Sequence, residues 1–284
     1  MSVGRRFGLL GDPVTHSLSP VLYETAFTVL GVPARYEVHR VARGDSVALR
    51  QMMLEVGSSG GGNVTVPHKE LAASHLNIRS SAVDGTGACN CFWLDSTGRL
   101  AGDNTDVGGF LAAAAGIDGL RLEGASVLLL GAGGAARAVA AACAVAGVRQ
   151  LAVRNRTRER AEAMIQELDL ADLAAVSSGQ EGPAGSYDLV VNATSLGLES
   201  SDPLPLVLER GRHSRAFDLV YGPGGTEWTR HAAATGIPST DGLSMLVHQA
   251  ALSLERWLGP MPDRIGVVRA MQRAAEAAAR PEAH

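Results

Sequence analysis

One glycine-rich turn between an apolar strand and an apolar helix constrains the fold of this chain more than any other feature. The sequence predicts a strand over residues 125–130, a turn over 131–134 and a helix over 135–146. The turn and the helix start read Gly131-Ala132-Gly133-Gly134-Ala135-Ala136, which fits the pattern G-x-G-x-x-A. Glycines in this pattern allow the tight turn and let backbone N–H groups approach a pyrophosphate at the helix N-terminus. We therefore predict a Rossmann-like, doubly wound α/β domain that binds a dinucleotide.

The end of the next predicted strand distinguishes between two dinucleotides. This strand covers residues 150–153 and is followed by Arg154-Asn155-Arg156-Thr157, then by Arg158 and Arg160. NAD-dependent enzymes place Asp or Glu at this point to bond the ribose hydroxyls, whereas guanidinium groups and hydroxyls suit a 2′-phosphate. An ordinary basic helix start is the structural alternative, but the helix dipole disfavours cations at that end. NADP is therefore the favoured cofactor.

Strands and helices alternate in the first hundred residues as well. We predict strands over 6–10, 36–41 and 63–66, helices over 19–30 and 47–56, a loop over 57–62, and a helix that begins at Pro67. Ser19 is expected to cap the first helix, with Pro20 in its first position. This alternation is typical of a mainly parallel sheet with helices packed on it.

A second unit is expected to start near Asp106. Beyond the glycine turn we predict buried strands over 187–192 and 216–221, a surface loop over 177–186, and a helix over 244–258. In that last helix Leu246, Ala250, Leu254 and Trp257 share one face. The length of 284 residues also favours about two domains.

Composition excludes several classes of protein. With 46% hydrophobic and 19% charged residues, the chain can bury real cores. A net charge of −4 argues against a nucleic-acid-binding face. No secretory signal is recognised, and the glycines within the apolar stretch 124–148 argue against a membrane span. Since three cysteines cannot form a disulfide framework, a cytoplasmic location is expected.

Lys69 is the only lysine among 25 lysine and arginine residues. Arginine stays charged at all relevant pH values, whereas the pKa of a lysine amine can be tuned for proton transfer. If Pro67 lies near the first helical position, Lys69 lies in the first turn, where the helix dipole should lower the pKa of its amine. Asp106 is a candidate to hold that amine. The structural alternatives are an exposed lysine that survived by chance and an aspartate that merely begins a helix, and spacing alone does not show that the two meet.

A series of motifs along the chain resembles the shikimate dehydrogenase family. The resemblance covers nearly the whole chain, and the motifs around Lys69 and Asp106 are more specific than the glycine turn. In order, the motifs are His16-Ser17-Leu18-Ser19-Pro20, Asn63-Val64-Thr65-Val66-Pro67-His68-Lys69, Gly87-Ala88-Cys89-Asn90, Asn104-Thr105-Asp106, the glycine turn, Asn155-Arg156-Thr157, Asn192-Ala193-Thr194-Ser195-Leu196-Gly197, Asp218-Leu219-Val220-Tyr221, and Gly242 through Met245-Leu246 to Gln249.

The resemblance implies reversible NADPH-dependent reduction of 3-dehydroshikimate to shikimate, a step of chorismate and aromatic amino-acid biosynthesis. It implies that Lys69 is the acid–base residue. It also implies that Asp106 bonds both the Lys69 amine and a substrate hydroxyl. Ser17 and Ser19 would hold the substrate carboxylate. Further contacts to the ring hydroxyls and the carboxylate would come from Thr65, Asn90, Tyr221 and Gln249.

The resemblance also implies an NADP site and a division of the chain. Residues 1–105 would form the substrate domain, 106–241 the NADP domain, and 242–284 C-terminal helices that return to the first domain. No nucleic-acid or membrane partner is expected, and the protein would be a monomer or a homodimer. The expected cofactor-binding residues are Ser81, Gly131, Ala132, Gly133, Gly134, Ala135, Asn155, Arg156, Thr157, Arg160, Leu219 and Gly242.

Some positions depart from the family pattern and leave the substrate open. The family usually has His-Asn where this chain has Tyr23-Glu24, Asn-Thr where it has Asn90-Cys91, and an acidic residue at Ser81. Two serines at Ser17 and Ser19 favour shikimate, while quinate or an amino analogue of shikimate remains an alternative. A non-catalytic NADPH-binding regulatory module is an alternative of a different class.

The histidines and cysteines do not predict a metal site. The eight histidines show no H-x-x-H spacing, and Cys89-x-Cys91 lacks partner ligands. His16 and His68 flank motif residues, where a structural hydrogen bond is the favoured role. We therefore expect no metal.

Overall fold

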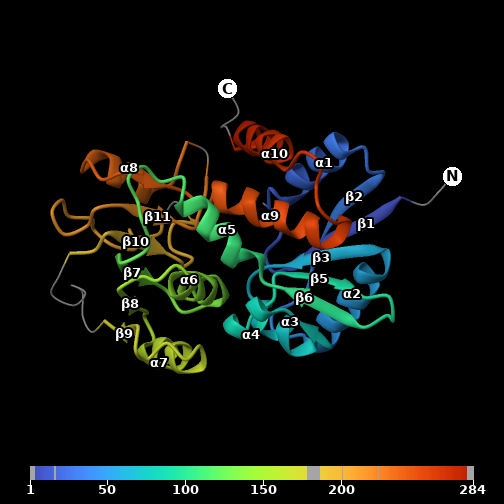
Figure 1. The fold of residues 1–284 in the computed structure, drawn as a ribbon, viewed down its shortest axis with the longest axis horizontal. Coiled ribbons are helices and arrows are strands. Elements are labelled where there is room, and N and C mark those ends of the chain that lie inside the picture. Colours follow the sequence, from blue (N-terminus) through green and yellow to red (C-terminus); the bar gives the residue numbers. More distant parts are fainter. Residues whose placement is uncertain (1–3, 16, 178–185, 200, 223, 280–284) are drawn as a thin grey trace. The chain divides into compact units, whose positions relative to one another are not determined.

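The computed structural model describes residues 4–15, 17–177, 186–199, 201–222 and 224–279, and every structural statement below refers to them. His16 and most of the loop predicted over 177–186 lie outside this set. The chain forms two compact units, Met1–Gly109 with Leu246–Ala278, and Phe110–Met245 with Ala279–His284 (Figure 1). Both internal boundaries fall within helices, α5 (Thr105–Ala114) and α9 (Leu243–Leu258).

The first unit contains a mixed sheet, in the order β2 (Ala34–Arg40), β1 (Arg5–Gly11), β3 (Gly60–Val64), β5 (Cys91–Leu94), β6 (Leu100–Asp103) and β4 (Ile78–Arg79). Strand β1 pairs in parallel with β2 and β3, and β4 pairs in parallel with β6, whereas β5 is antiparallel to both of its neighbours. The β5–β6 hairpin was not predicted; Asp95 closes it by accepting bonds from the N–H groups of Thr97 and Arg99. The prediction of a mainly parallel α/β unit is confirmed.

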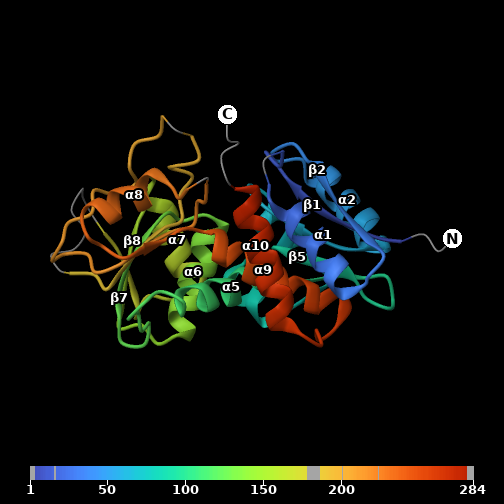
Figure 2. The same cartoon turned by 90° about the horizontal axis from the view of Figure 1, so that it is seen from above.

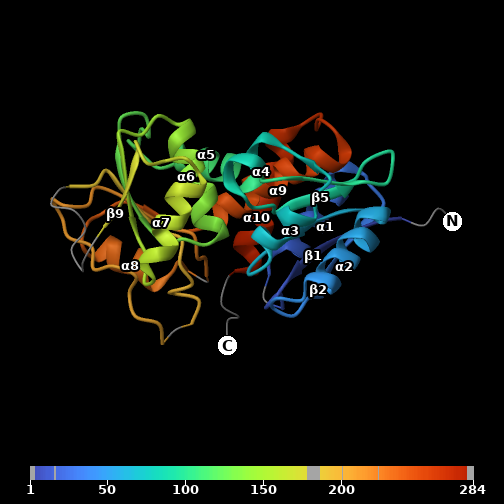
Figure 3. The same ribbon diagram turned by 90° about the horizontal axis from the view of Figure 1, so that it is seen from below.

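Alternation along β1 directs its side chains to opposite faces of this sheet. Phe7 packs on the Phe27 ring of α1 (Ser19–Leu30) and on Trp257 of α9, with centroids 5.1 and 4.8 Å apart. Leu10 instead joins a buried cluster with Leu49 and Met53 of α2 (Ser46–Ser59), which covers the other face (Figure 3).

The C-terminal helix returns to this first unit, as predicted. Helix α10 (Arg264–Ala278) packs against α1 (Figure 2). The short helices α3 (Lys69–His75) and α4 (Ser81–Thr86) complete the unit.

Three local predictions in this unit are wrong. Ser19 is not a cap: α1 starts at Ser19, and its N-cap is Leu18, whose side chain makes no cap bond. The helix expected at Pro67 starts at Lys69, because a turn joins the His68 N–H to the Thr65 carbonyl first. The loop expected over 57–62 is the end of α2 followed by β3.

The glycines of β3 are needed for close packing rather than for a loop. A Cβ on Gly62 would lie 2.6 Å from both the Gly8 carbonyl oxygen and the Phe92 ring, and one on Gly61 would lie 2.7 Å from the Trp257 ring. Consecutive glycines therefore mark a strand against which the neighbouring strands and an indole lie unusually close.

The second unit is a doubly wound parallel sheet, as predicted. Its order is β12 (Ser239–Thr240), β11 (Ala216–Asp218), β10 (Leu189–Asn192), β7 (Ser126–Leu130), β8 (Gln150–Arg154) and β9 (Ala174–Val176). The chain moves outward from β7 through β8 to β9, then crosses to the other side of β7 and continues through β10 to β12. The point of reversal lies between β7 and β10, where such sheets bind ligands. Helices α6 (Gly134–Val145), α7 (Arg158–Glu167) and α8 (Glu227–Ala234) follow β7, β8 and β11.

Candidate active site

Lys69 and Asp106 form a largely buried ion pair in the first unit. The Lys69 Nζ lies 2.6 Å from Asp106 Oδ2, and the two side chains are 14% and 6% exposed. Lys69 is the first residue of α3, and its carbonyl accepts a bond from the Cys89 N–H. The preceding His68 is buried and bonds the Val41 carbonyl oxygen through Nε2, so it has a structural partner.

Asp106 is held from its other side as well. It lies in the first turn of α5, where the helix dipole favours a negative charge. Its Oδ1 accepts a 2.8 Å bond from Asn90 Nδ2, and its N–H donates to Asn104 Oδ1. Since each carboxylate oxygen has a different donor, the plane of the carboxylate is fixed relative to the amine of Lys69.

Asn90 connects the pair to Gln249 of α9. Its Nδ2 also lies 3.1 Å from Gln249 Oε1 and 2.9 Å from Thr105 Oγ1, and Gln249 Nε2 donates to the Leu246 carbonyl. Four of the residues predicted for the site, Lys69, Asp106, Asn90 and Gln249, therefore form one hydrogen-bonded cluster. The side chains of Asn90 and Gln249 are both buried.

Ser17, Ser19 and Thr65 follow the carboxyl ends of two neighbouring parallel strands. Register pairs Leu10 of β1 with Val64 of β3, and the Thr65 N–H donates to the Leu10 carbonyl. Ser17 Oγ donates to Ser19 Oγ at 3.1 Å and accepts from the Ser19 N–H. Both hydroxyls are thus oriented at the start of α1. Ser81 is different: it is the first residue of α4, and its side chain is exposed.

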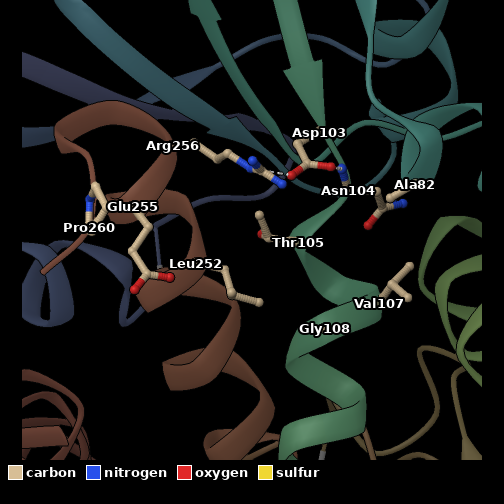
Figure 4. Close-up of a pocket in the computed structure, with 10 residues that line it drawn as sticks. All are labelled: Ala82, Asp103, Asn104, Thr105, Val107, Gly108, Leu252, Glu255, Arg256 and Pro260. Carbon is tan, nitrogen blue, oxygen red and sulfur yellow. Dashed lines mark hydrogen bonds and ion pairs between the residues drawn. The ribbon is translucent and has the colours of Figure 1, made fainter. Parts of the chain in front are cut away.

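A pocket of about 670 Å³ lies beside the N-terminus of α5 (Figure 4). Lys69 and Asp106 do not line it. On one side the Arg256 Nε donates to the buried Asp103 carboxylate at 2.6 Å. Asp103 also accepts from Ser80 Oγ, the N-cap hydroxyl of α4. The lining residues are Ala82, Asp103, Asn104, Thr105, Val107, Gly108, Leu252, Glu255, Arg256 and Pro260.

The glycine turn of the second unit has the geometry expected of a dinucleotide fingerprint. Gly131 follows β7 with φ +113°, and a Cβ there would lie 2.8 Å from the Ala193 carbonyl oxygen, so only glycine fits. Gly133 is the N-cap of α6 and has no side chain to satisfy the first N–H groups of the helix. A Cβ on Gly133 would meet nothing within 4 Å, which leaves room for a phosphate beside these donors.

The basic segment predicted to select NADP lies at the end of the neighbouring strand. Register pairs Leu130 of β7 with Arg154 of β8, so Arg154 and the glycine turn share one edge of the sheet. Asn155 Nδ2 donates to the Thr157 carbonyl, and Thr157 is the N-cap of α7. Arg156 and Arg160 are exposed, and within the described residues neither makes an ion pair.

Strands β10 and β11 also end at this edge of the sheet, each in a buried polar side chain. Asn192 of β10 is in register with Asp218 of β11, and its Nδ2 donates to Asp218 Oδ1 at 2.8 Å. Thr226 Oγ1 also donates to the Asp218 carboxylate, at 2.6 Å. Burial raises the pKa of Asp218, and these bonds offset part of that rise.

Asp218 precedes two of the predicted residues, Leu219 and Tyr221. The Gly242 N–H donates to the Val220 carbonyl, and a Cβ on Gly242 would lie 2.1 Å from the Leu219 carbonyl oxygen. Gly242 is therefore required for the backbone to approach Leu219. Tyr221 is partly buried in this second unit.

Several residues that complete the first cluster have no predicted role in the sequence motifs. Thr105 and Ser253 bond each other. Thr105 also bonds Asn90, Ser253 also bonds the Gln249 carbonyl, and Arg256 pairs with Asp103. Ser253 lies one helical turn after Gln249, and this spacing was the available signal. Within the described ranges there is no group of three or more metal-ligating side chains and no helix long and apolar enough to cross a membrane.

A doubly wound sheet with a glycine turn at its reversal point, together with a buried lysine–aspartate pair, defines an α/β protein of the dinucleotide-dependent dehydrogenase class. Three family models match this chain: the shikimate dehydrogenase substrate binding domain at residues 9–92, shikimate / quinate 5-dehydrogenase at 113–198, and the shikimate 5′-dehydrogenase C-terminal domain at 242–276. The chain belongs to the shikimate dehydrogenase family.

Individual relatives agree with this assignment. The shikimate dehydrogenase (NADP(+)) of Thermus thermophilus is 41% identical over 95% of this chain and 98% of its own length. That of Symbiobacterium thermophilum is 38% identical over 97% and 95%. The Thermus enzyme in complex with NADP(H) and shikimate is a structural neighbour, with a TM-score of 0.79 over 95% of this chain and 99% of that chain. A 5-ketofructose reductase of Gluconobacter is also similar, with 26% identity and a TM-score of 0.77 over 96% and 99%.

Proposed function

We propose that this protein is an NADP-dependent shikimate dehydrogenase, which catalyses the reversible reduction of 3-dehydroshikimate to shikimate in chorismate and aromatic amino-acid biosynthesis. The observation that carries the proposal is the Lys69–Asp106 pair. An amine 2.6 Å from a carboxylate, with the carboxylate held by Asn90, is a proton donor in a defined position. The identities of the substrate and the cofactor are inferred from the relatives whose names give NADP and shikimate.

Lys69 acts as the acid in the direction of reduction. Bound NADPH supplies the hydride that adds to the substrate carbonyl carbon. The Lys69 ammonium donates a proton to the carbonyl oxygen, which becomes the hydroxyl of the product, and the neutral amine regains a proton from solvent. Asp106 holds the ammonium and accepts a bond from a substrate hydroxyl. In the oxidation the neutral amine accepts the hydroxyl proton instead.

Polar side chains around this pair orient the ring. Ser17 and Ser19 would bind the substrate carboxylate, because their hydroxyls are already oriented by a mutual bond. Contacts to the ring hydroxyls and carboxylate are proposed for Thr65, Asn90, Tyr221 and Gln249. Asn90 and Gln249 are supported further by their direct contact in the cluster.

NADP fits the edge of the second sheet. The open glycine turn at the start of α6 would hold the pyrophosphate, and the exposed cations Arg156 and Arg160 would hold the 2′-phosphate. We propose residues 1–105 as the substrate domain, 106–241 as the NADP domain and 242–284 as C-terminal helices of the substrate domain. The proposed NADP-binding residues are Ser81, Gly131, Ala132, Gly133, Gly134, Ala135, Asn155, Arg156, Thr157, Arg160, Leu219 and Gly242.

We also propose that the enzyme is cytoplasmic. The three cysteines are buried free thiols, which suits a reducing compartment. The proposed working form is a monomer or a homodimer.

The experiment that tests the proposal measures NADPH formation by the purified protein with each combination of shikimate or quinate and NADP or NAD. We expect turnover with shikimate and NADP to exceed the other three combinations. Turnover that is faster with quinate would reassign the substrate within the family. No turnover in any combination, together with NADPH binding, would favour the regulatory module.

A further inference from the structure

A buried hydroxyl on α9 joins three elements behind the Lys69–Asp106 pair. Ser253 is fully buried, and its Oγ donates to the Gln249 carbonyl at 3.1 Å. The same oxygen accepts a 3.0 Å bond from Asn63 Nδ2 of β3. It also lies 3.2 Å from the Oγ1 of Thr105, which is the first residue of α5. Ser253 therefore connects α9, β3 and α5 at one atom.

Thr105 transmits this connection to Asn90. The Thr105 N–H donates to Asn90 Oδ1 at 2.7 Å, and Asn90 Nδ2 lies 2.9 Å from Thr105 Oγ1. Because the Ser253 hydroxyl donates to the Gln249 carbonyl, the Thr105 hydroxyl donates to Ser253 Oγ, and the Thr105 oxygen then accepts from Asn90 Nδ2. The Nδ2 is thereby directed at Asp106 Oδ1 and Gln249 Oε1. A rotated Asn90 amide would present an oxygen to a carboxylate and would repel it.

The position of Asn63 is also fixed from behind. Its Oδ1 accepts a 2.8 Å bond from the Tyr36 hydroxyl, and its Nδ2 donates to the Asn90 carbonyl as well as to Ser253. A rotation of Asn63 would break all three bonds. Ser253 Oγ therefore meets a donor whose direction is set independently of α9.

We infer that Ser253 is a positioning residue for the reaction proposed above: its hydroxyl fixes Thr105, and through Thr105 the Asn90 amide that aligns Asp106 with Lys69. The inference rests on the proposed function for its kinetic consequence. Its structural part, the alignment of Lys69, stands on the hydrogen bonds alone.

Two of the side chains near Ser253 are uncharged at physiological pH. Burial raises the pKa of both Tyr23 and Cys91, so both are neutral at physiological pH. Ser253 and Asn63 lie close enough to the Tyr23 hydroxyl to offset part of that rise, although neither makes a hydrogen bond of good geometry with it. Tyr23 and Cys91 are two of the positions that depart from the family pattern.

The test compares Ser253→Ala with two further variants. Ser253→Cys keeps the volume and a weak donor, and should recover part of any loss. Ser126→Ala is the matched control: Ser126 is also buried and bonds Arg149 through its side chain, but it lies at the start of β7, away from the glycine turn. Ser126→Ala is expected to lower stability and leave turnover per folded molecule unchanged.

The kinetic readout is kcat, the KM for shikimate and the primary deuterium isotope effect on hydride transfer. For Ser253→Ala we expect kcat to fall about 3- to 10-fold, the loss of one aligned hydrogen bond, with an unchanged KM and a larger isotope effect. A partly unfolded enzyme would lose activity with no change in the isotope effect. An isotope effect and a kcat per folded molecule equal to those of the wild type would overturn the inference.

A second readout does not depend on activity. Because Lys69 is the only lysine, protein labelled with [ζ-15N]lysine gives a single side-chain NMR signal. Ser253→Ala should shift this signal, Ser253→Cys should shift it less, and Ser126→Ala should not move it. An unmoved signal in Ser253→Ala would reject the alignment role. If the wild type failed to oxidise shikimate, the proposed function would fail while this signal still decided the role of Ser253.

Discussion

The Lys69 amine lies 2.6 Å from Asp106 Oδ2, although the two residues are separated by 37 positions and lie on different helices. Each begins its helix or lies in its first turn: Lys69 starts α3, and Asp106 is the second residue of α5. The dipole of α5 favours the carboxylate, whereas that of α3 opposes the ammonium. Asp106 therefore compensates for an unfavourable position of Lys69, which makes this pair the electrostatic centre of the site.

Replacing the charge of Asp106 tests this compensation. Asp106→Asn keeps the size of the side chain but removes the negative charge that holds the amine. We expect kcat to fall about 10- to 100-fold, since hydrogen bonds to charged groups contribute about 1.5–3 kcal/mol. Steady-state kinetics of shikimate oxidation would measure it. The exposed Asp84, which pairs with Arg79, provides the control, and equal losses in Asp84→Asn and Asp106→Asn would contradict the account.

Arg156 is predicted to select NADP over NAD. Arg156→Ala removes a guanidinium that is available for a 2′-phosphate, so the KM for NADP should rise about 10- to 100-fold while weak activity with NAD stays the same. The matched control is Arg158→Ala, because Arg158 already pairs with Glu162. A similar rise for both cofactors in Arg156→Ala would show that the residue does not read the phosphate.

The Asp103–Arg256 pair is predicted to stabilise the first unit. Arg256→Ala leaves a buried carboxylate with fewer donors, and the free energy of unfolding should fall by about 1–3 kcal/mol. Urea denaturation followed by circular dichroism would measure it. Arg99→Ala, which breaks an exposed pair with Asp95, should cost less than about 1 kcal/mol. The idea fails if the two variants lose equal stability.

His213 is predicted to make stability depend on pH. Burial lowers the pKa of His213, and its Nδ1 accepts a bond from the Glu209 N–H, which requires the neutral ring. The unfolded state then binds more protons below pH about 6.5, so this contribution to the unfolding free energy is complete above that pH and decreases as the pH falls toward the lowered pKa.

Unfolding measured from pH 7.5 downward, in the wild type and in His213→Asn, would reveal this contribution as a difference in slope. The asparagine keeps an acceptor for the Glu209 N–H but does not titrate. Parallel curves for the two proteins would show that His213 makes no such contribution.

Local patterns in the sequence were sufficient to predict the second unit. The strand before Gly131 is buried at all five positions. A run of apolar residues that ends in glycines is typical of a buried parallel strand followed by a helix. The doubly wound order then follows from the way such units repeat.

The first unit was predicted less completely, because contacts distant in sequence decide it. Gly60 to Gly62 resemble a loop until the Phe92 and Trp257 rings are seen to pack against them. The β5–β6 hairpin lacks the length that would mark it in the sequence.

The residue types of the site were recognisable, but their connections were not. Lys69 and Asp106 were identified as candidates from composition and helix position, whereas their contact required the fold. Ser253 resembles any small residue on an amphipathic helix, and its role appears only when Asn63 and Thr105 meet it.

The most direct test of the central claim is the kcat for NADP-dependent oxidation of shikimate by Lys69→Ala, measured beside the wild type and accompanied by the Kd for NADPH. General acid–base catalysis contributes about 10²- to 10⁴-fold, so we predict a loss of kcat in that range with an unchanged Kd. Turnover by Lys69→Ala at the wild-type rate would contradict the account.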